Sequence, residues 1–165
     1  MTSFPGELIE AAKWAHTGTV LALLQQDADP NEKNKWGDTA LIWAAVNGHT
    51  EIMRMLIDAG ARVNERGYQG ITALMYAAKK GHRKAALLLI GKGADIDSKN
   101  NDGDTAMALA EQDGYTEIAQ ILKNISAEKI KAAAAEDARI KCVTDPALHR
   151  NMPMPKPLRF KPGKK

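Results

Sequence analysis

The stretch WGDTALIWAAVNGH, residues 36–49, contains two tryptophans, a histidine, an aspartate and two glycines within fourteen positions. Such a mixture is compatible with an active site or with a structural repeat. The repeat is favoured because QGITALMYAAKKGH (69–82) and DGDTAMALAEQDGY (102–115) carry the same skeleton at intervals of 33 residues. A pattern that recurs at a fixed period of this length indicates repeated architecture.

Each repeat is predicted to contain two helices joined by a tight turn. Small residues at one place in the first helix allow close helix-helix approach: Ala11 and Ala12, Ala44 and Ala45, Ala77 and Ala78, and Ala110. A chain leaving a helix commonly needs the left-handed conformation that glycine accepts, and glycine recurs there at Gly48, Gly60, Gly81, Gly93 and Gly114. Threonine hydroxyls are expected to cap the helices: Thr39, Thr72 and Thr105 for the first helices, Thr50 and Thr116 for the second.

These features resemble those of the ankyrin-repeat family, whose unit of about 33 residues carries a T-P-L-H-x-A signature. The resemblance covers roughly residues 7–124 of a predicted repeat domain at 1–124, with units at 7–34, 35–67, 68–100 and 101–124. It implies an all-α solenoid of about four helix-turn-helix units with hairpin-like loops. After it, an alanine-rich helix over 125–144, with Ser126 as its cap, is expected to cover the last unit, and 145–165 forms a basic, proline-rich, extended tail.

The signature departs from the family pattern in a consistent way. TALI (39–42), TALM (72–75) and TAMA (105–108) have alanine in place of the proline. The histidine is replaced by Ile42, Met75 and Ala108. A proline pre-sets the first helical turn, so we expect these units to be less rigid than units with the full signature.

The composition is that of an ordinary globular protein of one domain, with 44% hydrophobic and 26% charged residues in 165. We find no apolar run near the roughly 18 residues that span a bilayer. The opening MTSFPGELIE has no secretory pattern, which favours a cytoplasmic protein, or a periplasmic or secreted one if Met1 precedes an already processed chain. The single Cys142 excludes an internal disulfide and disfavours structural zinc.

The chemical candidates all have structural explanations. His16, His49 and His82 are 33 residues apart, and equivalent positions on stacked helices lie about 8 to 10 Å apart, too far for one metal ion. NNDGDTAMALAE suggests a calcium loop, but with Gly103 in the sixth place Leu109 occupies the position of the terminal glutamate. We see no phosphate-binding glycine motif or activated nucleophile. The sequence therefore predicts no enzyme activity, no cofactor, no metal and no small-molecule substrate.

The resemblance implies a partner-binding concave face made by the hairpin tips and the first helices. Trp36 and Tyr68 are the large aromatic residues at the tips, where the scaffold buries little of them, and protein interfaces are enriched in such side chains. Trp43 and Tyr76, at the helix starts, are open to two interpretations, core packing or contact. The residues expected to contact the partner are Trp14, Trp36, Asp38, Asn47, Tyr68, Gln69, Ile71, Lys79, Lys80, Asp102 and Asp113.

The tail, DPALHRNMPMPKPLRFKPGKK, holds five of the seven prolines and has a charge of +5, which leaves −2 for the rest of the chain. It is either a solvated extension or a second contact segment, with Met154, Arg159 and Phe160 as the expected contacts. The whole chain is therefore predicted to be a protein-binding module, monomeric when free, that inhibits or protects a partner, possibly an enzyme. One alternative is a scaffold that bridges two proteins. Another is contact with nucleic acid or an anionic surface, which the net charge of −2 outside the tail disfavours.

Overall fold

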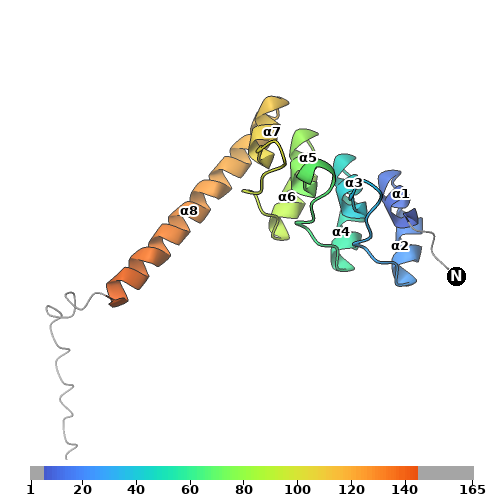
Figure 1. Cartoon of the computed structure of the whole chain (residues 1–165), viewed down its shortest axis with the longest axis horizontal. Helices are drawn as coiled ribbons and strands as arrows, with labels where there is room; N and C mark the ends of the chain where they lie inside the picture. The colour runs from blue at the N-terminus through green and yellow to red at the C-terminus, as the bar shows by residue number, and fades with distance from the viewer. Residues whose placement is uncertain (1–5, 145–165) are drawn as a thin grey trace, which may run out of the picture. The chain divides into compact units, whose positions relative to one another are not determined.

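The computed structural model describes residues 6–144, with side chains through residue 134. This part folds into eight α-helices, two for each repeat, as Figure 1 shows. The first helices of the units are α1 (Glu7–Lys13), α3 (Ala40–Val46), α5 (Ala73–Lys79) and α7 (Ala106–Gln112). The second helices are α2 (Thr17–Gln25), α4 (Thr50–Asp58), α6 (Arg83–Gly91) and α8 (Thr116–Thr144).

The threonines before the first helices act as N-caps, as predicted. Thr39 Oγ1 accepts a hydrogen bond from the Ile42 N–H at 3.4 Å, and Thr72 and Thr105 do the same for the residues three positions on. The prediction that Thr50 and Thr116 cap the second helices is wrong, since each is the first residue of its helix. The tight turn places His49 at the N-cap position of α4, and the His49 side chain makes no capping hydrogen bond.

The core is formed by stacking like helices on like. Helix α1 contacts α3, α3 contacts α5 and α5 contacts α7, while α2, α4 and α6 contact one another in sequence. Leucines at equivalent places, Leu8, Leu41 and Leu74, are buried, and so are the alanine pairs beside them. Because alanine lets helix backbones come close, each unit buries the apolar stripe of the next.

The loops between units are hairpin-like, with little β-structure. Each is closed by a backbone hydrogen bond of 3.0 Å, from the Asn34, Gly67 and Asn100 N–H to the carbonyls four residues on. A single antiparallel bridge, Arg66 with Thr72, is the one β-type pairing in residues 6–144. A 3-10 turn, η1 (Tyr68–Gly70), lies inside the same loop.

Two asparagines link neighbouring loops in the same way. The Asn31 amide donates to the Gly60 carbonyl at 3.1 Å and accepts from the Arg62 N–H at 2.7 Å. Asn64 repeats both bonds 33 residues later, with the Gly93 carbonyl and the Asp95 N–H. The 33-residue spacing of the two asparagines is the sequence signal for this role, which was not among the predictions.

The predicted separate helix over 125–144 is wrong in its start, because α8 runs without interruption from Thr116 to Thr144 (Figure 1). Asp27, Gly60 and Gly93 end the earlier second helices with positive φ. Ser126 stands at the equivalent place in α8 and stays helical, and the alanine-rich sequence after it favours continuation. Burial of apolar side chains ends at Leu122, and the compact repeat unit ends at Ala127.

No helix in residues 6–144 combines the length and the apolar character required to cross a bilayer.

Candidate functional site

Five aromatic residues gather on the first helices and the loops that precede them, and we call this surface the aromatic face. Trp14 follows α1, and Trp36 and Tyr68 lie in the loops before α3 and α5. These three expose 62%, 53% and 51% of their surface. Trp43 in α3 and Tyr76 in α5 are half-buried and pack against the core. Exposed apolar groups on neighbouring elements are characteristic of interaction sites.

The aromatic face contains two adjoining hollows that share Trp43 and Lys13 as a common wall. The first, of about 360 Å³, is lined by Lys13, Trp36, Asp38, Trp43, Tyr68 and Tyr76. The second, of about 380 Å³, is lined by Lys13, Trp14, Trp43, Asn47 and His49. The residues that line the two hollows come from the first three units. Trp43 and Tyr76, left open between core packing and contact, therefore both pack against the core and line a hollow.

Two lysine ammonium groups already lie against the tryptophan rings. Lys13 Nζ is 4.8 Å from the centre of the Trp43 ring and 5.1 Å from that of Trp14. Lys35 Nζ is 4.2 Å from the centre of the Trp36 ring. Glu10 holds the first arrangement, because its carboxylate accepts from the Trp14 indole N–H at 3.0 Å and lies 3.9 Å from Lys13 Nζ. The tryptophan faces are thus partly occupied by cations of the chain itself.

Asp38 lies at the base of the first hollow and is only 6% exposed. Its Oδ1 accepts a hydrogen bond of 2.8 Å from the Tyr68 N–H, and this bond fixes the loop before α5 against the loop before α3. Burial raises the pKa of the Tyr76 phenol above its ordinary value, and the negative charges of Asp38 and of ionised Tyr68 act in the same direction. Tyr76 therefore lines the hollow as a neutral hydroxyl at physiological pH.

The indole nitrogen of Trp43 lacks a hydrogen-bond partner. Trp43 Nε1 is the one buried side-chain nitrogen or oxygen without a partner in the described part of the chain. Leaving such a donor unpaired costs about 1 to 3 kcal/mol. The Trp43 ring lines both hollows, but its nitrogen is buried.

The other predicted contacts fall into three groups. Ile71 is buried in the core, so its prediction as a contact is wrong: the loop that it closes turns its side chain inward. Asn47 and Gln69 are exposed but also structural, because the Asn47 amide donates to the Lys13 carbonyl at 3.1 Å and the Gln69 carbonyl accepts from the Asn101 N–H at 2.9 Å. Of the others, Lys79 is half-buried, and the exposed residues are Lys80, Asp102 and Asp113.

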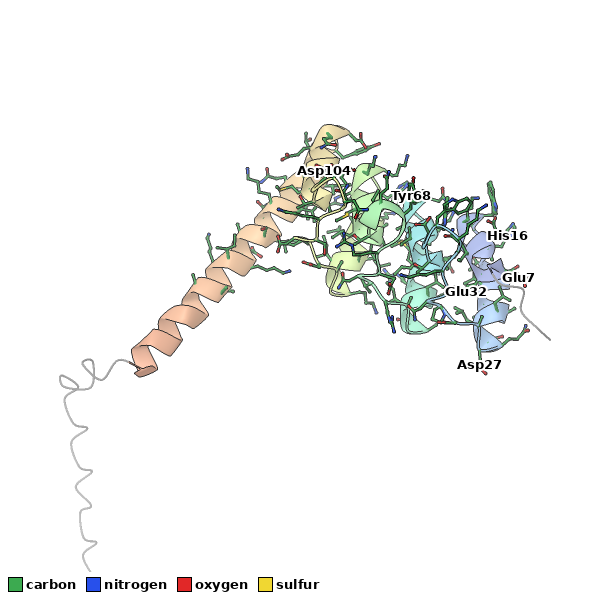
Figure 2. All side chains as sticks on the ribbon, in the orientation of Figure 1. Glu7, His16, Asp27, Glu32, Tyr68 and Asp104 are labelled. Carbon is green, nitrogen blue, oxygen red and sulfur yellow. The ribbon has the colours of Figure 1, made fainter. Side chains whose placement is uncertain are left out.

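Figure 2 labels Tyr68 and Asp104, which lie in successive loops of the array. The remaining predicted contacts, Met154, Arg159 and Phe160, lie outside the described residues.

The periodic histidines join neighbouring units through hydrogen bonds. His49 Nε2 is 3.2 Å from the Lys13 carbonyl, and His82 Nε2 is 3.0 Å from the Val46 carbonyl. A Cβ at Gly48 would lie 2.7 Å from His82 Nδ1, so the ring packs closely on the preceding turn. Within the described residues, no group of three or more His, Cys, Asp and Glu is placed to hold a metal ion.

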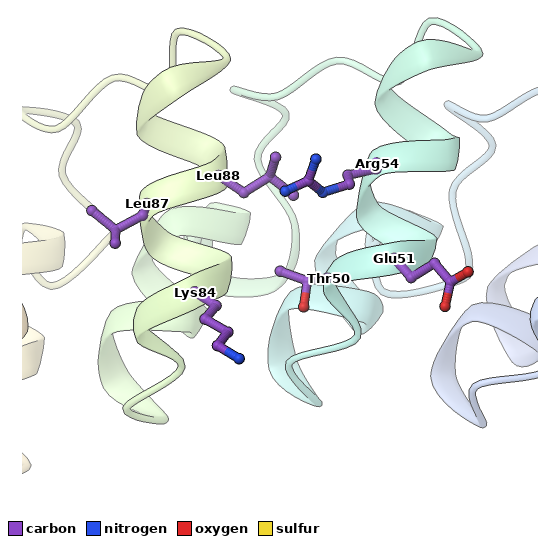
Figure 3. Close-up of a pocket in the computed structure, with 6 residues that line it drawn as sticks. All are labelled: Thr50, Glu51, Arg54, Lys84, Leu87 and Leu88. Atoms are coloured by element: carbon purple, nitrogen blue, oxygen red, sulfur yellow. The ribbon is translucent and has the colours of Figure 1, made fainter.

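A larger groove, which we call the outer groove, lies between the second helices, away from the aromatic residues. It has a volume of about 600 Å³, lies between α4 and α6, and is drawn in Figure 3. Its lining residues are Thr50, Glu51, Arg54, Lys84, Leu87 and Leu88. No aromatic ring and no unpaired buried donor lines this groove, so it serves below as a control surface.

Comparison with known families agrees with this geometry. The family model described as ankyrin repeats, in three copies, matches residues 8–100. No curated protein sequence matches the chain.

Proposed function

Because the chain belongs to the ankyrin-repeat family, it is a protein-protein interaction module, and we propose that it inhibits or protects one protein partner by covering that partner's functional surface. The aromatic face is the proposed contact surface. Binding itself is then the output that we assign to the molecule. An ankyrin array supplies a rigid surface for such occlusion.

The exposure of Trp14, Trp36 and Tyr68 is the observation that supports this proposal. Side chains of this size lose contact with water only when a partner covers them, and interface hot spots are enriched in tryptophan and tyrosine. The backbone is held by hydrogen bonds at each of them: the Lys13 carbonyl beside Trp14 accepts from the Asn47 amide, the Trp36 N–H donates to Asn34 Oδ1 within its own loop, and the Tyr68 N–H donates to Asp38 Oδ1. The face is therefore pre-organised, which reduces the entropy that binding costs.

A scaffold that bridges two partners is the second candidate function. It is favoured by the division of the chain after Ala127 and by the +5 charge of residues 145–165, which could serve a different partner. Recovery of two proteins bound to one chain at the same time would support it. The −2 charge of the remaining residues disfavours nucleic acid as the ligand of the repeats.

The test begins with the partner recovered by affinity purification and mass spectrometry. We expect the double variant Trp36→Ala with Tyr68→Ala to weaken that complex while helical content is unchanged. Interface anchors of this kind contribute about 2 kcal/mol or more each. Calorimetry measures the affinity, and circular dichroism measures the helical content.

Leu87→Ala is the matched control, because Leu87 is an exposed apolar residue of α6 in the outer groove. It should leave the affinity unchanged. An affinity that is the same in the double variant and the parent chain would remove the aromatic face from the proposal.

A further inference from the structure

The shape of the aromatic face suits an extended ligand rather than a single side chain. Its two hollows lie side by side, with Trp43 and Lys13 between them, and they involve successive repeats. Packed helices lie about 8 to 10 Å apart. A polyproline II segment presents residues i and i+3 on the same side about 9.3 Å apart, from three residues per turn and a rise of 3.1 Å. Two such residues can therefore enter neighbouring hollows.

Aromatic rings line both hollows, and proline-rich segments dock in grooves lined by aromatic side chains. Trp36 and Tyr68 line the first hollow, Trp14 lines the second, and Trp43 lies at the wall that they share. The indole nitrogen of Trp43 is buried, so a bound segment meets the ring of this residue and not its N–H.

The charges around the hollows favour an uncharged segment. Lys13 and Lys35 lie over the Trp43 and Trp36 rings, so an additional cation would meet like charge on those faces. An anion in the first hollow would meet the buried carboxylate of Asp38. Burial and this carboxylate also raise the pKa of Tyr76, which shows that new negative charge is disfavoured there.

We propose that the two aromatic hollows bind an uncharged, proline-rich segment of the partner in the polyproline II conformation, with its proline rings packed against the aromatic side chains that line them. This inference rests on the proposed function, because it names the part of the partner that the aromatic face covers. Proline rings fill aromatic hollows well, and the segment loses little entropy because it is already extended. The recognition is thus by shape and backbone conformation, with tryptophan and tyrosine rings on each side of the bound chain.

The test uses the full chain and three synthetic peptides of about nine residues, capped at both ends. The first repeats Leu-Pro-Pro, the second replaces each proline by serine, and the third repeats Arg-Ser-Ser. Tryptophan fluorescence and calorimetry follow binding. We expect the proline peptide to bind at least about tenfold more tightly than either of the others, about 1.4 kcal/mol.

Two variants locate the peptide. Trp36→Ala removes an exposed ring from the first hollow, and Trp14→Ala removes one from the second. Both leave the core intact, and each should weaken proline-peptide binding about tenfold or more, the loss of one aromatic anchor. Leu87→Ala in the outer groove should have no effect.

Three results would overturn the inference. One is equal binding of the proline and serine peptides. Another is tighter binding of the arginine peptide that is lost in Asp38→Asn, which would assign the first hollow to a cation. The last is unchanged affinity for the proline peptide in Trp36→Ala.

The proposed function fails separately from this inference. If the proline peptide does not bind but Trp36→Ala with Tyr68→Ala weakens the partner complex, the aromatic face binds a different feature of the partner. If neither the peptide nor the complex responds, both proposals fall.

Discussion

At the scale of single residues, Ala15 has a backbone conformation that does not suit its side chain. Its φ is 61°, while Gly48, Gly81 and Gly114 hold φ values of 72° to 82° at the equivalent place in later units. The turn is the same in each case, because the N–H of the next residue bonds the carbonyl five residues before it, at 2.9 Å for His16 and 2.8 Å for His49. The first unit therefore makes a glycine turn with an alanine.

Ala15→Gly is expected to stabilise the protein by roughly 0.5 to 1 kcal/mol. An alanine held in the left-handed region costs about 1 to 2 kcal/mol, which the glycine variant does not incur. Glycine also makes the unfolded chain more flexible, and this lowers the stability by about 0.4 to 1 kcal/mol and offsets part of the gain. Ala15 is exposed, so no packing is lost. Chemical denaturation of the two chains measures the difference.

The matched control is Gly48→Ala, which should destabilise the protein by more than 1 kcal/mol. It adds a Cβ at 2.7 Å from His82 Nδ1 as well as the cost of the left-handed conformation. Equal stability of all three chains would mean that the turn relaxes freely, contrary to the strain argued here.

At the scale of elements, the first helices lack the proline of the family signature, but the threonine before each helix has the extended conformation that a proline would require. Thr39, Thr72 and Thr105 are extended, with φ between −99° and −91° and ψ between 166° and 168°. This is the conformation that a following proline requires. In the third unit, the Met75 sulfur accepts from the Thr72 N–H at 3.5 Å, so one hydrogen bond of the missing histidine has a substitute.

Replacing the first helical residues, Ala40, Ala73 and Ala106, by proline is expected to raise the melting temperature. Proline at the first helical position loses no hydrogen bond and reduces the entropy of the unfolded chain, by about 0.4 to 1 kcal/mol per site. Differential scanning calorimetry of the single and triple variants measures the change. The control Ala44→Pro, in the middle of α3, should destabilise by about 3 kcal/mol. A lower melting temperature in all three single variants would show that the buried sites do not accept the ring.

At the scale of the whole molecule, the stability is expected to reside in the repeats, while residues 145–165 are expected to add to the binding of the aromatic face without stabilising the fold. The repeats carry the buried apolar residues, and the compact unit that they form ends at Ala127. Residues 145–165 carry five prolines and a charge of +5. Lys156, Arg159 and Lys161 in this segment can raise the association rate with an acidic partner.

Truncation after Thr144 is therefore expected to keep the unfolding transition and to weaken the partner complex. The difference in affinity between the full and the truncated chain should become smaller at high salt. Salt screens the charges of residues 145–165, so the full chain then loses the attraction that these charges provide. Circular dichroism and calorimetry at two salt concentrations test both parts. A sharp fall in thermal stability with unchanged affinity would assign the segment to the folded unit instead.

The local pattern of residues was enough to determine the repeat architecture. The period of 33, the threonine caps Thr39, Thr72 and Thr105 and the alanine pairs all predict features that the structure contains, because capping and helix contact depend on residues close in sequence or repeated in phase. The same local rules failed at Ser126, where the alanine-rich sequence continues the helix instead of starting a new one.

Only the tertiary structure decided which residues of each loop face outward and which hollows they form. Trp36 and Ile71 were both predicted as contacts at the loop tips, yet Trp36 is exposed and Ile71 is buried in the core. The pairing of Asp38 with the Tyr68 N–H and the unpaired indole of Trp43 depend on residues from different repeats. Contacts between repeats leave no period in the sequence when their members differ from unit to unit.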